Sequence, residues 1–392
     1  MEPIRLAGPA DVLAVLPYQL GYHPSDSLVA VVLRDRQVGL VERIDLPPDD
    51  AVEEACAAAV EPLLREAPDS VLLVGYESHP GAALPLADAV RDRMLAAGIV
   101  VLDRLVVRDG RWYAPDCETG CCPSRGDEQV IPRDSPAVAP FVALEVAPLP
   151  GRQSLAELVS ADPELTAPVA AALDRLAVRT DRLIGVAVQG QGVDAIAGEA
   201  QGSGPGERVV AVHRLRYLAT WATVLEVSDT SDDSDGHGRD GNGGQGPVWG
   251  AEQVALLVAS LRDVQLRDAL IAWICPGTLP LDALSPDLVD ALHSCLPDPA
   301  WVGHQGDEVA VVAGRRVVTR LQSVVRAVPD EQAAALLTVL ANLAWWLGDG
   351  ALTRVALDRA LEHSPGYRLA RLLERMVDLG VRPRSPRSEL TA

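Results

Sequence analysis

The stretch SVLLVGYESHPGAALPLADAVRDRMLAAGIVVLDRLVV (residues 70–107) decides the fold of the first part of the chain. It opens with a short apolar run at residues 70–75 and closes with another at residues 99–107, and both runs are typical of buried strands. Residues 82–97, between them, have the length and the apolar spacing of a helix. This order predicts a crossover unit whose two strands lie parallel in one sheet.

The neighbouring segments extend this prediction to an α/β domain over residues 1–128. Residues 27–46 consist of two β-rich runs joined by a polar turn, which is typical of a hairpin. Residues 49–67 are rich in Ala and Glu, with acidic residues in the first turn, where the helix dipole favours them. Further on, Asp109-Gly110 predicts a tight turn into one more strand.

Beyond residue 128 the pattern changes to helices, because apolar side chains recur every three to four residues in five stretches. These stretches are residues 155–159, 168–178, 209–226, 251–261 and 264–274. We therefore expect an all-α C-terminal part. It consists of a helical region at residues 129–227, with a variable insertion at 181–206, and a helical domain at residues 248–380.

Two segments are too polar to bury apolar area. Residues 228–247 are rich in Asp, Ser and Gly and predict a disordered acidic loop. Residues 381–392 predict a disordered tail, whose three arginines are more typical of a solubilising end than of a nucleic-acid contact.

The end of the helical domain has the character of a tetratricopeptide unit, a pair of packed helices of about 34 residues. A following helix at residues 367–379 could cover the pair. The match is incomplete, since a leucine stands where an aromatic residue is usual, and an ordinary helical hairpin is the alternative. Packing residues occur at the expected positions Leu337, Leu340, Ala341, Gly348, Thr353, Leu357, Ala360 and Pro365.

Composition excludes several classes of protein. The chain has 392 residues and a formal net charge of −21, which disfavours binding to nucleic acids and to anionic membranes. It contains no lysine, so the usual phosphate-loop hydrolases, protein kinases and pyridoxal-phosphate enzymes are excluded in their standard forms. The start has no secretory signal pattern and the six cysteines form no disulfide framework, so we expect a cytoplasmic protein.

The most unusual cluster of chemical groups is Cys117, Cys121 and Cys122. Three thiolates and a histidine could hold Zn²⁺ in tetrahedral geometry. Standard zinc sites, however, use two-residue spacers, and a redox site would use the same spacing. Zinc binding, a redox role and inert packing in a tight loop therefore remain three alternatives.

A second cluster contains His23, Asp26 and two serines, which suggests a hydrolase with His23 as the base for a serine nucleophile. The cluster precedes its strand, whereas ligands of parallel sheets bind beyond the carboxyl ends of strands. We therefore expect this loop at the other edge of the sheet, with Asp26 satisfying backbone amides of its own turn.

The loop after residues 70–75 lies at the favourable edge, between a strand and the start of a helix. It carries Tyr76, Glu77, Ser78 and His79. Amino-terminal ends of helices attract anions, and these side chains could act as binding or acid–base groups. No nucleotide-binding fingerprint accompanies them. The loop therefore predicts a ligand site but does not indicate which ligand binds there.

Several motifs together resemble an actinobacterial family of unknown function, number 4192. The opening resemblance is LAGPADVLA followed by PYQLGYHPSDSLV, at residues 6–14 and 17–29. Further matches are VLLVGY at residues 71–76, GRWY at 110–113 with the cysteine cluster, and GDGAL at 348–352 with the helix after it. The resemblance implies a lineage and a cytosolic protein, and it implies no activity.

Two hypotheses about function follow. The first is a non-catalytic binding or scaffold protein that contacts an unidentified protein partner through its helical C-terminal domain, because no catalytic constellation is complete. The second is a small-molecule or metal-dependent enzyme, in which the loop at Glu77–His79 and the loop at Cys117–Cys122 line one pocket of the α/β domain.

Overall fold

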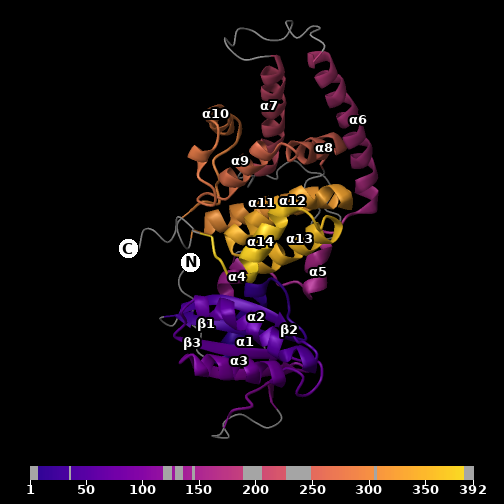
Figure 1. Cartoon of the computed structure of the whole chain (residues 1–392). Coiled ribbons are helices and arrows are strands. Elements are labelled where there is room, and N and C mark those ends of the chain that lie inside the picture. Colours follow the sequence, from indigo (N-terminus) through magenta and orange to yellow (C-terminus); the bar gives the residue numbers. More distant parts are fainter. Residues whose placement is uncertain are drawn as a thin grey trace. The chain divides into compact units, whose positions relative to one another are not determined.

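The computed structural model describes residues 8–34, 37–117, 126–128, 136–143, 146–188, 205–226, 249–303 and 307–383. The chain divides into two compact units (Figure 1). The sheet unit comprises Met1–Leu155 and Arg375–Arg382, and the helical unit comprises Ala156–Glu374 and Pro383–Ala392. The expected mixed α/β part and the mostly helical part are therefore both present.

The sheet unit contains one mixed sheet with the strand order β2-β1-β3-β4-β5-β6. β3 and β4 are parallel and are connected through helix α3 (Leu84–Ala96), which confirms the predicted crossover unit. The other neighbouring strands are antiparallel. The strands are β1 (Ser27–Arg34), β2 (Gln37–Asp45), β3 (Ser70–Tyr76), β4 (Val100–Arg108), β5 (Arg111–Tyr113) and β6 (Asp127–Glu128).

The hairpins are also as predicted. β1 pairs with β2, and β4 turns back into β5 through Asp109 and Gly110. Both turn residues have positive φ, 53° and 68°, as a tight two-residue hairpin turn requires.

The direction of β1 matters most for the candidate site. β1 runs antiparallel to β3, with Ser27 opposite Tyr76 and Leu33 opposite Ser70. The beginning of β1 therefore lies beside the carboxyl end of β3. Loops that precede β1 and follow β3 consequently meet at one edge of the sheet.

The core of the sheet unit lies on both faces of the central strands. On one face, Leu28, Leu73 and Met94 belong to a buried cluster formed with α2 (Val52–Arg65) and α3. Side chains that point to the opposite face, such as Val29 and Val74, are just as buried. A glycine at position 75 lets the end of β3 approach Ala83, at the start of α3, closely. A Cβ at position 75 would lie only 2.5 Å from the Cβ of Ala83.

The sheet unit extends beyond residue 128, where composition placed a boundary. Phe141 in α4 (Ala139–Ala143) packs with Val15 of α1 (Pro9–Leu20), and its ring centroid lies 5.1 Å from that of Tyr18. Further along, the amide of His23 donates to the Leu149 carbonyl at 2.9 Å. These contacts keep residues 136–143 and 146–149 in the first unit.

The helical unit is built mainly from long helices, and each of the five predicted stretches overlaps a helix of the structure. α6 and α7 extend into residues 181–206, which the sequence suggested as an insertion. No helix of the described residues is long and apolar enough to span a membrane. The division between the units falls within α5 (Arg152–Glu157) and α14 (Arg368–Asp378). The other helices of the helical unit are α6 (Pro163–Val188), α7 (Pro205–Leu225), α8 (Ala251–Ser260), α9 (Val264–Ile274), α10 (Pro286–Cys295), α11 (Glu308–Arg326), α12 (Asp330–Leu347) and α13 (Gly350–His363).

The predicted helical hairpin consists of α12 and α13. Gly348 ends α12 in the left-handed conformation, and the Asp349 side chain accepts a hydrogen bond from the Leu352 amide to begin α13. Every residue from 336 to 344 is buried, so α12 lies in the core of the helical unit and presents no groove along this stretch. That the hairpin is a tetratricopeptide unit stays a prediction. Residues 228–247 and 384–392, expected to be disordered, lie outside the described part of the chain.

Candidate functional site

The first candidate site is the edge where the loop before β1 meets the loop after β3. The Ser78 amide donates to Oδ1 of Asp26 at 2.9 Å, and the Ser78 hydroxyl donates to Oδ2 at 2.9 Å. The expectation that His23 and Asp26 lie at the other edge was therefore wrong. It assumed that β1 runs parallel to β3, whereas the two strands are antiparallel.

The contact between Asp26 and Ser78 does not make a nucleophile. The two hydrogen bonds from the Ser78 hydroxyl and amide lower the pKa of Asp26, so the carboxyl group is held as an anion. The Ser78 hydroxyl proton is directed at this carboxylate and not at an imidazole, whereas a serine nucleophile needs a histidine as its base. His23 and His79 both have exposed side chains near these loops.

Glu77 stabilises the loop after β3 at this edge of the sheet. Its side chain is 1% exposed. Its carboxylate accepts hydrogen bonds from the amides of Gly81 (3.0 Å) and Ala83 (2.9 Å), and a guanidinium nitrogen of Arg108 lies 2.6 Å away. The carboxylate thus occupies the amino-terminal approach to α3, where we expected an external anion to bind. Because all its partners are internal, Glu77 holds the loop in place.

Tyr76 points into the fold. Its side chain is buried, and burial raises the pKa of its hydroxyl. Ser27, opposite Tyr76 in the sheet, is buried as well. Neither hydroxyl oxygen has a hydrogen-bond partner in the described structure. Tyr76 therefore does not present its hydroxyl to solvent at the edge.

Cys117, the one described residue of the cluster Cys117, Cys121 and Cys122, lies away from this edge of the sheet. Asp116 contacts Arg104 at 2.6 Å. Arg104 precedes Arg108 by four residues, which at about 3.3 Å per residue corresponds to roughly 13 Å along β4. Cys117 follows Asp116, so it lies away from Glu77, while Cys121 and Cys122 fall outside the described residues. Among described residues, no group of three His, Cys, Asp or Glu is suited to hold a metal ion, and the zinc hypothesis stays a prediction.

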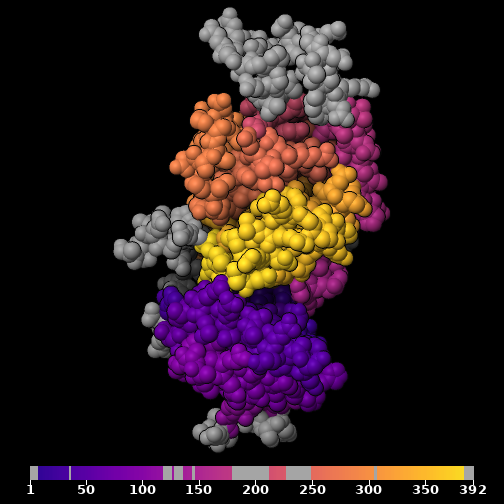
Figure 2. Space-filling view, in the orientation of Figure 1, coloured from indigo at the N-terminus to yellow at the C-terminus, as the bar shows by residue number. Residues whose placement is uncertain are grey.

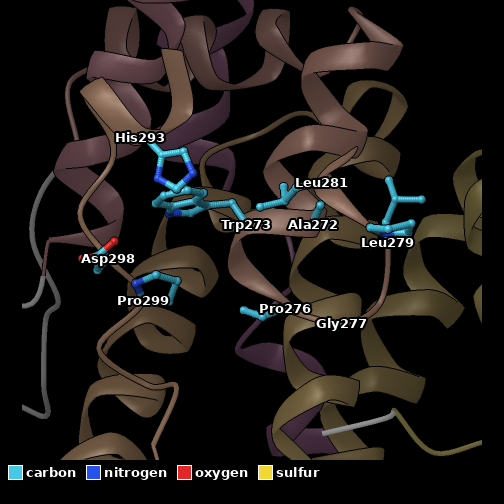
Figure 3. A pocket seen from close by; sticks show the side chains of 10 residues that line it. Ala272, Trp273, Pro276, Gly277, Leu279, Leu281, His293, Asp298 and Pro299 are labelled. Atoms are coloured by element: carbon cyan, nitrogen blue, oxygen red, sulfur yellow. The ribbon is translucent and has the colours of Figure 1, made fainter. Parts of the chain in front are cut away.

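The second candidate site is a cleft of about 450 Å³ in the helical unit, which the sequence did not indicate (Figure 3). It lies between the end of α9, the loop that follows, and the end of α10. Its volume falls in the range of small-molecule sites. In Figure 2 the orange segment that carries these residues forms part of the surface of the helical unit. The lining residues are Ala272, Trp273, Pro276, Gly277, Leu279, Pro280, Leu281, His293, Asp298 and Pro299.

Indole groups fix the walls of this cleft. The indole N–H of Trp273 donates to the Pro297 carbonyl at 3.1 Å, which ties α9 to the segment after α10. The indole N–H of Trp346 donates to the Pro276 carbonyl at 3.0 Å. Trp301 is fully buried and donates in the same way to the carbonyl of residue 274, at 2.8 Å. Three of the chain's seven tryptophans therefore hold the backbone around one cleft.

Two polar side chains in the cleft have no internal partner. The His293 ring lies edge-on to the Trp273 ring, with a centroid distance of 4.8 Å and an interplanar angle of 82°. Neither His293 nor Asp298 forms a hydrogen bond or ion pair with the described part of the chain. Figure 3 shows the His293 ring against Trp273, with Asp298 and Pro299 to one side and Leu281 and Leu279 to the other. Both side chains are exposed and available to a ligand.

Comparisons with known proteins place the chain in a family but give no activity. Neither the curated proteins nor the solved structures include a match to it. The family model described as "Domain of unknown function (DUF4192)" matches residues 9–285 and 307–384. His293 and Asp298 thus come from the stretch between the two matched parts, whereas Trp273 and Leu281 lie within the first. The chain belongs to the DUF4192 family.

Proposed function

We propose that the protein is a non-catalytic binding protein whose helical unit takes a small ligand with an apolar body into the cleft between α9 and α10. The observation that carries the proposal is the built character of the cleft. Its walls are mostly proline, leucine and tryptophan, and hydrogen bonds from Trp273 and Trp346 hold them in position. A cleft formed before binding costs little ordering when a ligand enters.

The other parts of the molecule support binding over catalysis. At the sheet edge, the acceptor atoms of Asp26 and Glu77 already have internal donors. The sequence predicts a protein partner that contacts the helical C-terminal domain, and the buried residues 336–344 of α12 are not accessible to such a partner. Within the described residues of the helical unit, we take the cleft beside Trp273 as the place where a ligand binds.

A neutral probe of suitable shape tests the proposal. Phenylbutanol titrated into the full chain and followed by calorimetry should bind with a dissociation constant on the order of 1 mM, as expected for a ligand of this size. Leu281→Gln replaces part of the apolar wall and should weaken binding about fivefold. Leu372→Gln is the matched control, because Leu372 is exposed on α14 and lies outside the cleft.

Two results would contradict the proposal. One is the absence of any heat of binding up to about 10 mM probe, well above the expected constant. The other is equal weakening by both leucine variants, which would mean that the probe binds the surface nonspecifically.

A further inference from the structure

We infer that the ligand of this cleft is an organic cation, a protonated amine carried on an apolar body. This inference rests on the proposed function and adds the charge of the ligand. Three observations support it. They are the polar groups of the cleft that have no partner in the described structure, the restricted backbone around Asp298, and the negative net charge of the chain.

The backbone acceptors near the cleft are largely used. The carbonyls of Pro276 and Pro297 accept from indole N–H groups, and the carbonyl of Cys275 accepts from the Thr278 hydroxyl at 2.6 Å. The polar side chains that remain are His293 and Asp298. A ligand that enters therefore meets one carboxylate, from Asp298, and one imidazole, from His293.

A protonated amine is complementary to the carboxylate of this cleft. It donates to the Asp298 carboxylate in a charge-assisted hydrogen bond. No arginine is among the described residues that line the cleft, so an anionic ligand would meet Asp298 with nothing to compensate its charge. A neutral alcohol can also donate a hydrogen bond to Asp298, but without the positive charge that strengthens the bond from an ammonium group.

The backbone around Asp298 is restricted before any ligand arrives. Pro297 and Pro299 flank Asp298, so φ is fixed at both neighbours, and the residue before a proline is confined to extended conformations. The Pro297 carbonyl is in turn bonded to Trp273. Asp298 is therefore part of a segment that is anchored to α9, which reduces the entropy lost on binding.

The charge of the whole chain acts in the same direction. A formal net charge of −21 produces a negative potential around the protein, which attracts cations and repels anions at low salt. This contribution is screened by salt, whereas the contact with Asp298 is short-range and is screened less. The two contributions can therefore be separated by experiment.

Three probes of one shape test the inference: phenylbutylammonium, phenylbutanol and phenylbutyrate, titrated into the full chain at physiological salt. We expect the ammonium probe to bind about fivefold more tightly than the alcohol, and the carboxylate probe to bind most weakly. Asp298→Asn should bring the ammonium probe and the alcohol to within about twofold of each other. Asp282→Asn is the matched control, because Asp282 is an exposed carboxylate next to Leu281 that does not line the cleft.

Each outcome has a distinct meaning. If the alcohol binds as tightly as the ammonium probe and Leu281→Gln weakens both, the inference fails and the proposed function stands. If Asp282→Asn removes the preference as much as Asp298→Asn does, the preference belongs to the general field of the chain and the inference fails. If none of the three probes binds, the proposed function fails as well.

Discussion

The sheet edge and the helical cleft each contain carboxylates and histidines, yet their carboxylates differ in whether internal groups donate hydrogen bonds to them. At the edge, Glu77 and Asp26 accept hydrogen bonds from neighbouring amides, from Ser78 and from Arg108. In the cleft, Asp298 has no partner in the described structure, while the indoles satisfy the backbone around it.

This difference separates structural polar groups from groups available to a ligand. A carboxylate whose donors are all internal stabilises the fold, and removing it leaves those donors without partners. A carboxylate without internal donors contributes little to stability and keeps its capacity for a ligand. Mutations at the two places should therefore differ in whether they change stability or binding.

Glu77→Ala should have the largest effect on stability. It removes a buried carboxylate and leaves Arg108 and two amides without their acceptor, which costs about 3 kcal/mol in the free energy of unfolding. Calorimetry should show a lower midpoint for the transition of the sheet unit. Glu61→Ala is the control, because Glu61 on α2 is exposed and should change stability by about 0.5 kcal/mol or less. Equal effects of the two variants would remove the structural role of Glu77.

Gly75→Ala should have the next largest effect. The new Cβ would lie 2.5 Å from the Cβ of Ala83, so β3 or the start of α3 must shift, at a cost of about 2 kcal/mol. Gly151→Ala serves as the control in the same unit, since nothing lies within 4 Å of a Cβ there. A Gly75→Ala protein with unchanged urea unfolding would mean that this close approach does not exist.

Ser78→Ala should have a smaller effect, mainly on titration. The variant loses the hydroxyl hydrogen bond, so the pKa of Asp26 should rise toward its usual value of 3.8, which carbon-detected NMR of the carboxyl group measures. Since the folded pKa is lowered, Asp26 stabilises the fold above its unfolded pKa and loses this contribution as the pH falls through the folded pKa. Ser78→Ala should flatten that acid dependence.

The control for this titration is Ser25→Ala, whose exposed side chain makes no contact with Asp26 among the described bonds. An unchanged Asp26 pKa in Ser78→Ala would contradict the geometry. Labelling of Ser78 by a fluorophosphonate would be a stronger contradiction, because it would show an activated serine where the structure has a hydroxyl bonded to a carboxylate.

Asp298→Asn should have the smallest effect on stability, within about 0.5 kcal/mol, because Asp298 is exposed and has no internal partner in the described structure. Comparing the thermal unfolding midpoints of Asp298→Asn and Glu77→Ala therefore tests whether the two carboxylates differ in their contribution to stability. A loss of stability similar to that of Glu77→Ala would show that Asp298 belongs to the fold and is not held for a ligand.

The sequence predicted the elements of the sheet unit well, because local patterns determine them. The crossover unit at residues 70–107 and the turn at Asp109-Gly110 follow from apolar periodicity and turn chemistry. The pairing of β1 with β3 could not be predicted in the same way, because the direction of a strand depends on partners distant in sequence. This missing information placed His23 and Asp26 at the wrong edge.

The helical unit was predicted less completely. α11 was not predicted, although its buried positions such as Ala310, Val317 and Leu321 recur at helical spacing; it is rich in Val, a residue with modest helix propensity. The cleft combines residues 272–281 with residues 293–299, and its anchors include Trp301 and Trp346. Because no single stretch carries this pattern, the useful signal was the clustering of scarce tryptophans, which only the fold reveals.

Fluorine NMR of the full chain labelled with fluorotryptophan tests the central claim most directly. On titration with phenylbutylammonium, the signal of Trp273 should shift progressively, whereas that of Trp221, fully buried and bonded to the Ser260 hydroxyl at 2.9 Å, should stay in place. A Trp273→Phe variant assigns the signal. If the Trp273 signal stays fixed while the probe is in excess, or if all tryptophan signals move together, the cleft is not the ligand site and the account is contradicted.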